Sequence, residues 1–279
     1  MYRGFNLSIP LHDISITDDN DDDDVNELIK IGKEIFQDTK IKVKSTLDDY
    51  LLDNKRLDGN KIINEWFPEV NAHIFLSHSH KDEKLAFLLA GFFHEAFNIY
   101  TFIDSAVWGY SDDLLRQLDD KYCKNSNNTN YNYLKRNYST AHVHMMLSNS
   151  LNRMIDNCEC IMFLNTPNSI VTSNEINNKT NSPWIFSEIN TSIIVQKKTP
   201  KRLQRKIKVF SSNEMKMLNE SDQQQLLIDY NVELSHLTNL DKDDLINWCK
   251  TSENTTAEKA LDDLYTQHPL NKRFFSNER

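Results

Sequence analysis

A polar run that could bind a ligand follows directly on an apolar run near residue 75. The apolar run 74–76 (Ile-Phe-Leu) leads into the polar run 77–82 (Ser-His-Ser-His-Lys-Asp). Consecutive apolar residues are typical of a strand that is covered on both faces of its sheet. From Asp82 onward, apolar residues recur at helical spacing, with acidic residues in the first turn. A strand, a polar tip and a helix in this order indicate a site at the carboxyl edge of an α/β sheet.

A second candidate group lies at the start of a helix predicted from residue 183. Ser182 can cap this helix, and Pro183 suits its first position. One arc of the helix is expected to be buried and holds Ile185, Phe186, Ile189 and Ile193. Trp184, Glu188 and Thr191 share the edge of that arc, so Glu188 is predicted to face a cleft. The alternative is an ordinary, solvent-exposed glutamate.

A third group follows the strand predicted at 98–104. This strand ends in Asp104, and a loop with Ser105 and Trp108 comes next. The Asp104 carboxylate could accept hydrogen bonds from a ligand or cap the following turn, and both alternatives remain open.

The polar run 77–82 also permits a metal-binding interpretation. It is similar to the His-x-His-x-Asp-His tip of metallo-β-lactamase-like hydrolases, and His142 and His144 could add imidazole ligands. However, Glu83 stands where that family has its next histidine, and five glycines are few for a fold with Gly-rich metal loops. We therefore predict no metal site. The alternative to a metal-binding role is that His78 and His80 are solvated loop residues.

Strand and helix patterns alternate from residue 70 onward, which predicts an α/β fold with a doubly wound parallel sheet. Further strands are expected at 160–165, 207–210 and 232–237. Further helices are expected from Asp112 and at 143–155, 241–250 and 256–268.

Three parts of the chain differ in pattern. Residues 1–69 are predicted to be an N-terminal extension with an acidic run at 18–24 and short helices at 25–36 and 47–52. The main domain is expected at 70–240, with an insertion near 115–141. The C-terminal helices are assigned to 241–279.

Composition limits the expected partners. The net charge of −9 and the pI near 5.5 do not suggest sequence-independent binding to nucleic acid or anionic lipid. No apolar run approaches the roughly 18–20 residues of a membrane span, and the first residues lack a signal peptide's apolar core. We expect a cytoplasmic protein without nucleic-acid or membrane partners. Cys158 and Cys160 are expected to fill the core.

The polar run 77–82, the strand end at Asp104 and the Trp184–Glu188 pair occur in the order found in Toll/interleukin-1 receptor (TIR) domains. Residues 70–215 thus resemble a TIR domain of the NAD-cleaving type, which implies a flavodoxin-like fold. The resemblance implies that Glu188 is catalytic, that NAD is a substrate and not a cofactor, and that the domain self-associates, with an exposed Trp108 contributing. It implies that the substrate-binding residues are Ser77, His78, Ser79, Asp104, Ser105, Trp108 and Trp184.

A single carboxylate is sufficient for this chemistry. Nicotinamide leaves a cationic pyridinium as a neutral molecule, so no general acid is needed, and an oxocarbenium-like ribose remains. An anionic Glu188 could stabilise that positive charge. The chain has no Gly-rich dinucleotide fingerprint, which argues against a redox dehydrogenase. The expected function is NAD cleavage in antiviral or stress defence signalling; the alternatives are a non-catalytic TIR interaction module and a metal-dependent hydrolase.

Overall fold

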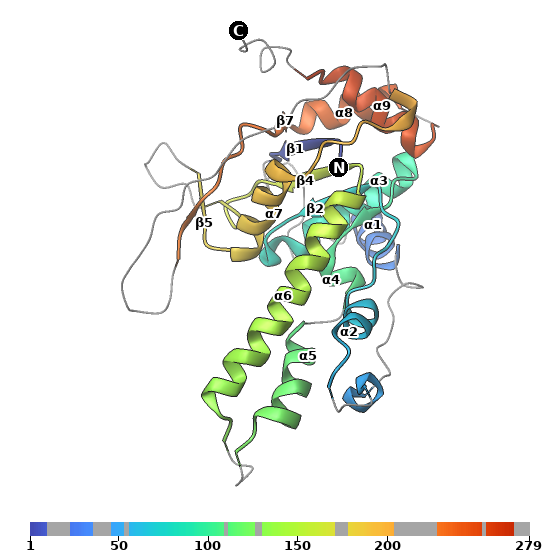
Figure 1. Ribbon diagram of the computed structural model, residues 1–279. Helices are drawn as coiled ribbons and strands as arrows, with labels where there is room; N and C mark the ends of the chain where they lie inside the picture. The colour runs from blue at the N-terminus through green and yellow to red at the C-terminus, as the bar shows by residue number, and fades with distance from the viewer. Residues whose placement is uncertain are drawn as a thin grey trace.

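Five strands from separate parts of the chain form the central parallel sheet of the computed structural model (Figure 1). Their order across the sheet is β3 (Thr101–Phe102), β2 (Ile74–Ser77), β4 (Cys160–Leu164), β1 (Arg3–Leu7) and β7 (Thr238–Leu240). A separate antiparallel pair joins β5 (Lys179–Thr180) to β6 (Tyr230–Asn231). The structure describes residues 1–9, 23–35, 46–52, 56–108, 111–125, 130–170, 178–203, 228–252 and 255–270.

The chain reverses its direction across the sheet at β2. β3 pairs with one side of β2, and the next strand of the sheet, β4, pairs with the other side, both in parallel. A reversal of this kind opens a crevice at the carboxyl ends of the strands, where ligands of α/β proteins bind. The predicted α/β class with a parallel sheet is therefore confirmed, and the polar run after β2 lies at the reversal.

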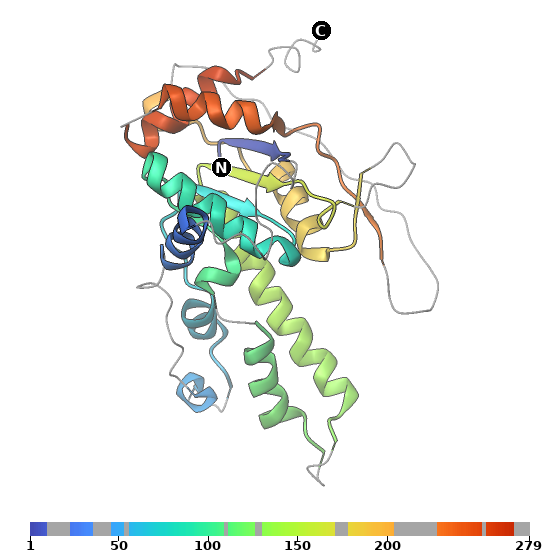
Figure 2. The same ribbon diagram turned by 180° about the vertical axis from the view of Figure 1, so that it is seen from behind.

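Helices lie on both faces of the sheet, as the two opposite views show (Figures 1 and 2). α3 lies on one face, and α6 and α7 lie on the other. The helix bounds are α1 Asp23–Glu34, α2 Gly59–Trp66, α3 Glu83–Phe97, α4 Asp104–Val107, α5 Ser111–Leu118, α6 Tyr133–Asn157, α7 Pro183–Ile194, α8 Lys242–Thr251 and α9 Ala257–Gln267. Short 3₁₀ turns occur at Leu47–Tyr50, His80–Asp82 and Lys201–Leu203, and a π turn occurs at Asp119–Cys123.

The N-terminal residues contribute an inner strand of the sheet. β1 pairs along its length with β4 and also with β7. The prediction that 1–69 is an extension outside the sheet is therefore wrong for Arg3–Leu7. Phe5, Leu7 and Ile9 alternate with polar residues as in a strand, but this signal is short and follows an arginine and a glycine. The buried Arg3 guanidinium is accommodated by hydrogen bonds to the His268 carbonyl (2.7 Å) and the Thr238 hydroxyl (3.1 Å).

The two C-terminal helices belong to the same core. The Trp248 ring of α8 is fully buried and stacks on Phe97 of α3, with 4.2 Å between ring centroids. Its indole nitrogen donates a hydrogen bond to the Ala260 carbonyl of α9 at 2.7 Å. α8 and α9 confirm the helices predicted at 241–250 and 256–268, and their packing adds them to the α/β unit.

Other predicted elements vary in accuracy. The helix predicted at 25–36 appears as α1, and the one at 143–155 is the second half of the longer α6. The strand predicted at 98–104 is reduced to β3, because residues from Asp104 onward turn into α4. The strand at 232–237 is wrong, since β6 and β7 lie on either side of it. The strand at 207–210 lies outside the described residues, as does the acidic run 18–24 before Asp23.

α1 packs closely against α3 through two glycines. A Cβ atom on Gly32 would lie 1.9 Å from the Phe87 carbonyl oxygen, and one on Gly91 would lie 1.9 Å from that of Leu28. Both positions therefore require glycine at this helix crossing. The contact fixes α1 on the outer side of α3.

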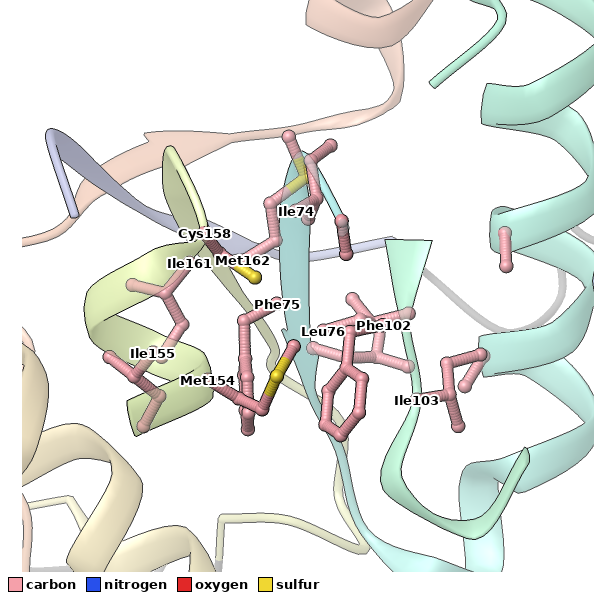
Figure 3. Packing of buried hydrophobic residues seen from close by; sticks show 14 of the residues in the cluster. Ile74, Phe75, Leu76, Phe102, Ile103, Met154, Ile155, Cys158, Ile161 and Met162 are labelled. Atoms are coloured by element: carbon pink, nitrogen blue, oxygen red, sulfur yellow. The ribbon is translucent and has the colours of Figure 1, made fainter. Parts of the chain in front are cut away.

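The core is continuous around β2. Ile74, Phe75 and Leu76 are buried, and Figure 3 shows Phe75 beside Met154 and Ile155 of α6. The Cys158 and Cys160 thiols are buried as predicted, and burial raises the pKa of Cys158 to about 12. Within the described ranges, none of the helices combines the length and apolarity needed to cross a bilayer. This packing holds β2 on both faces and so fixes the position of the residues at its end.

Candidate functional site

A cavity of about 290 Å³ opens at the carboxyl edge of β2 and β3. Its walls come from β2, α4, α6 and α7, four elements that are far apart in the sequence. Six of the eight site residues predicted from the sequence line it, namely His78, Asp104, Ser105, Trp108, Trp184 and Glu188. The cavity therefore lies where the reversal of strand order predicts a ligand site.

Helix α7 places Glu188 in this cavity. The Ser182 hydroxyl accepts a hydrogen bond from the Ile185 backbone N–H, and Pro183 occupies the first turn, as predicted. The buried face differs from the predicted arc, because Ile193 is exposed and Glu188 and Ser192 are buried in its place. Glu188 is only 6% exposed. It is therefore not a solvent-exposed surface glutamate but a buried residue of the cavity wall.

Ser77 is the residue in the described part of the chain that donates a hydrogen bond to Glu188. Its Oγ lies 2.6 Å from Glu188 Oε2, and both side chains are buried. Ser77 is the last residue of β2, so its position is set by the sheet. The hydrogen bond joins two predicted site residues that are 111 positions apart.

The Glu188 carboxyl group has an altered acidity. Burial raises its pKa to about 8, the negative charge of Asp104 adds to the increase, and the Ser77 hydrogen bond opposes it. Loss of water disfavours the charged form of a carboxyl group, and a nearby anion does the same. The raised pKa favours the protonated form of Glu188 at neutral pH.

The helix α4 brings two further polar groups to the cavity. Asp104 begins this helix, and its side chain has no hydrogen-bond partner among the described residues. The buried Ser105 hydroxyl likewise has no partner within the described part of the chain. Buried polar groups are normally satisfied. As far as the described residues go, both groups are thus available to bind the polar groups of a ligand.

Trp108 is not the exposed loop residue that the sequence suggested. Its side chain is 4% exposed, and its indole nitrogen donates to the Pro68 carbonyl at 2.9 Å. The ring packs edge-on against Phe102 and Phe67, at centroid distances of 5.0 and 5.6 Å. The prediction failed because residues 104–107 form a helix and the turn after α2 covers the ring. Trp108 forms part of the cavity wall.

The remaining predicted residues have mixed positions. His78 is half-buried, with its Nδ1 3.2 Å from the Leu76 carbonyl oxygen. Trp184 is half-buried and meets the His144 ring edge-on at 5.6 Å. Ser79 is not part of the cavity lining and precedes the turn His80–Asp82. Trp184 thus offers an aromatic surface at the cavity, whereas Ser79 has no visible role there.

The sequence analysis did not identify the apolar wall of the cavity. Leu147 and Leu151 of α6 line it opposite the polar groups. Their spacing of four residues was interpreted as part of a core face, and nothing in that spacing separates a cavity wall from a core. Ser111 and Ser182 also line the cavity and had been considered only as helix caps.

The residues of the metal interpretation are only partly brought together, since His78 and His80 line the cavity but Asp82 and His142 have other partners. Asp82 accepts hydrogen bonds from Thr166 Oγ1 (2.5 Å) and Asn168 Nδ2 (2.7 Å) in the loop after β4. The His142 ring packs on Tyr138, away from the polar run. In the described ranges, no three His, Cys, Asp or Glu side chains are grouped as a metal site requires.

Comparison with known proteins assigns no family to this arrangement. The chain matches no protein-family model, no curated protein and no solved structure. The function is therefore inferred from the chemistry of the cavity itself.

Proposed function

We propose that this protein cleaves the bond between nicotinamide and ribose in NAD, with Glu188 as the catalytic residue. The observation that carries the proposal is the buried Glu188 carboxyl group, which is held by Ser77 and faces a cavity that also contains Asp104 and Trp184. A carboxyl group with a strongly raised pKa in a cavity is a common feature of active sites.

In this proposal, the positive charge of the substrate changes the protonation state of Glu188. The nicotinamide ring of NAD is cationic, and a cation near Glu188 and Asp104 favours loss of the Glu188 proton. The proton passes to solvent water, and the carboxylate stabilises the oxocarbenium-like ribose as the C–N bond breaks and nicotinamide departs with the bonding electrons. Water then adds to the ribose carbon and loses a proton to give ADP-ribose, or a nucleophilic atom of the substrate itself adds there to give a cyclic isomer. Because the carboxylate is buried, its effect on the transition state is larger than in water.

The other cavity residues fit binding roles in this reaction. The free hydroxyl of Ser105 and the carboxylate of Asp104 are suited to ribose hydroxyls. The Trp184 ring offers a face for an aromatic base. Leu147 and Leu151 form an apolar wall that limits the access of water, which bears on whether the product is ADP-ribose or a cyclic isomer.

The strand order supports a TIR-type fold as part of the proposal. Taken in chain order, β2, β3 and β4 occupy positions that match the 2-1-3 part of the flavodoxin-like order. The next position is filled by β1 from the N-terminal side, which departs from a simple strand succession. We place the activity in the cytoplasm, in defence signalling.

The direct test is product analysis. Concentrated protein is incubated with NAD, and released nicotinamide, ADP-ribose and cyclic isomers are separated by chromatography. The proposal expects nicotinamide in amounts equal to the NAD lost. A folded protein that releases no nicotinamide at any concentration would instead be a binding module without catalysis.

The rate is expected to rise with pH up to about 8. The active form of Glu188 is the carboxylate, so kcat/KM, which reports the free enzyme, should rise about tenfold per pH unit below 8 and then level off. Asp104→Asn removes the anion that helps to raise the Glu188 pKa, so the midpoint should move to lower pH. The midpoint is measured from the pH dependence of nicotinamide release, and Asp112→Asn, at an exposed position, is the control. An unmoved midpoint in Asp104→Asn would contradict the coupling.

Chelation is expected to leave the protein unchanged. Asp82 is bonded to Thr166 and Asn168, and among the residues that the structure describes no three His, Cys, Asp or Glu side chains are grouped as a metal site requires. Treatment with EDTA should therefore change neither the thermal unfolding midpoint nor nicotinamide release. Metal analysis that finds stoichiometric zinc or manganese, together with loss of activity on chelation, would favour the metal-dependent hydrolase.

A further inference from the structure

Helix α6 carries an apolar stripe that faces solvent. With α5 it projects away from the sheet as an arm, which both views show (Figures 1 and 2). Leu134, Tyr138 and Met145 are 75%, 70% and 59% exposed, and Ala141 between them is exposed as well. Large apolar side chains exposed in a row indicate a binding surface.

The spacing places these residues on one side of the helix. Successive members are four, three and four residues apart. At 3.6 residues per turn, the four side chains fall within a band of about 60°. The residues that pack inward, Val143, Leu147 and Met154, lie about 180° away. α6 therefore has two opposite apolar stripes, whereas a helix that serves one core needs only one.

The outer stripe is complementary to itself. Its spacing is the same from either end, so an antiparallel copy of α6 would place Leu134 opposite Met145 and Tyr138 opposite Ala141. The large Tyr138 side chain then meets the small Ala141 near the centre of the contact, and Leu134 meets Met145 at each end. Contacts in which residue i meets j and j meets i define a two-fold interface. A spacing of three and four residues is also that of helices that pair side by side.

We propose that the outer stripe of α6 is a homodimer interface, in which α6 of a second copy packs against it in the antiparallel direction. The stripe is defined by Leu134, Tyr138, Ala141 and Met145. Tyr138, whose ring meets that of His142 at a centroid distance of 4.5 Å, forms the centre of the contact. Buried tyrosines are frequent anchors of protein interfaces.

The charge distribution favours a second copy at this place. The whole chain carries −9, so most of its surface repels another copy. Residues 111–157 contain six Lys or Arg and five Asp, which leaves the arm nearly neutral. The segment 121–155 has five Lys or Arg and no Asp or Glu, and acidic residues just before it balance part of this charge: Asp119 pairs with Arg136, and Asp120 pairs with Lys124. Two copies therefore meet with the least repulsion when they meet at their arms.

The interface is connected to the cavity through the same helix. Leu147 and Leu151, one and two turns beyond Met145, form the apolar wall, and His144 meets Trp184. Pairing of two α6 helices would hold this wall in place. This effect on the cavity rests on the proposed function, whereas the dimer does not.

The test compares two tyrosines of the full chain by sedimentation equilibrium. Tyr138→Ser removes the centre of the stripe and should raise the dimer dissociation constant by at least about 30-fold. Tyr133→Ser is the matched control, because Tyr133 is 75% exposed and near Tyr138 in sequence but lies about 100° off the stripe. It should change the constant by less than about threefold. A wild-type chain that stays monomeric at high concentration, or equal effects of both variants, would overturn the proposal.

Cysteine cross-linking tests the direction of pairing. In a Cys249→Ser background, Leu134→Cys mixed with Met145→Cys should form a disulfide-linked dimer on oxidation, whereas Leu134→Cys alone should form no disulfide-linked dimer. Efficient cross-linking of Leu134→Cys with itself would overturn the antiparallel arrangement. If monomers instead bind anionic lipid vesicles through the outer stripe, the proposed homodimer interface is wrong. The two proposals fail independently. A chain that stays monomeric but cleaves NAD contradicts only the dimer, and a chain that dimerises but releases no nicotinamide contradicts only the proposed function.

Discussion

Glu188→Gln is expected to lower the rate of nicotinamide release by about 10²–10³-fold or more. Glutamine keeps the size of the side chain and an oxygen that can accept the Ser77 hydrogen bond. It cannot become negative when the cationic substrate enters, so the developing charge on ribose is no longer stabilised. Steady-state assays measure the loss. Glu83→Gln, which removes a carboxylate at the same sheet edge but outside the cavity lining, is the matched control and should retain full activity.

The same substitution should stabilise the fold at high pH. The pKa of Glu188 is about 8 in the folded protein and near 4.5 when exposed, so the folded state binds more protons between these values. Its contribution to stability is therefore fully present below pH 4.5 and is lost as pH rises through 8. Glutamine does not titrate, and above pH 8 the variant should exceed the wild type by up to ~3–5 kcal/mol. Urea unfolding at pH 5 and pH 9 tests this; a difference that does not grow with pH would contradict the buried, raised-pKa state.

Trp108→Ala is expected to destabilise the fold by about 3–5 kcal/mol, the usual cost of removing a large buried aromatic side chain. The ring fills the space between Phe67 and Phe102, and its N–H satisfies the Pro68 carbonyl. Trp108→Phe should cost less, because it retains an aromatic ring and loses mainly one hydrogen bond. Chemical denaturation of the three proteins provides the measurement. A cost below about 1 kcal/mol for Trp108→Ala would show that the ring is exposed in solution.

The parts of the site that depend on local sequence could be predicted. The start of α7 follows from Ser182 and Pro183, and the spacing from there places Glu188 on a definite side of the helix. β2 and the turn after it follow from an apolar run that ends in polar residues. Each of these signals lies within one or two turns of chain, where propensity and capping dominate.

The parts that depend on distant segments could not be predicted. The hydrogen bond between Ser77 and Glu188 and the burial of Trp108 under the Pro68 turn arise from tertiary packing alone. The raised pKa of Glu188 depends on burial and on Asp104, a residue from another element. β1 is the clearest failure, because its strand signal is limited to a short alternation of apolar and polar residues and its pairing partners are remote.

The inner position of β1 has a consequence for the synthesis of the protein. Asn6 bonds to Asn165 and Asn239, which are 159 and 233 positions further along the chain. At the translation rates of cells, roughly 5–20 residues per second, β1 waits tens of seconds for both neighbours. β1 can pair with β4 once β4 has been made, and its other edge then stays open until β7 follows. Such non-local closure slows folding, and until β7 pairs, the edge of β1 presents unpaired backbone groups to which another chain can bind.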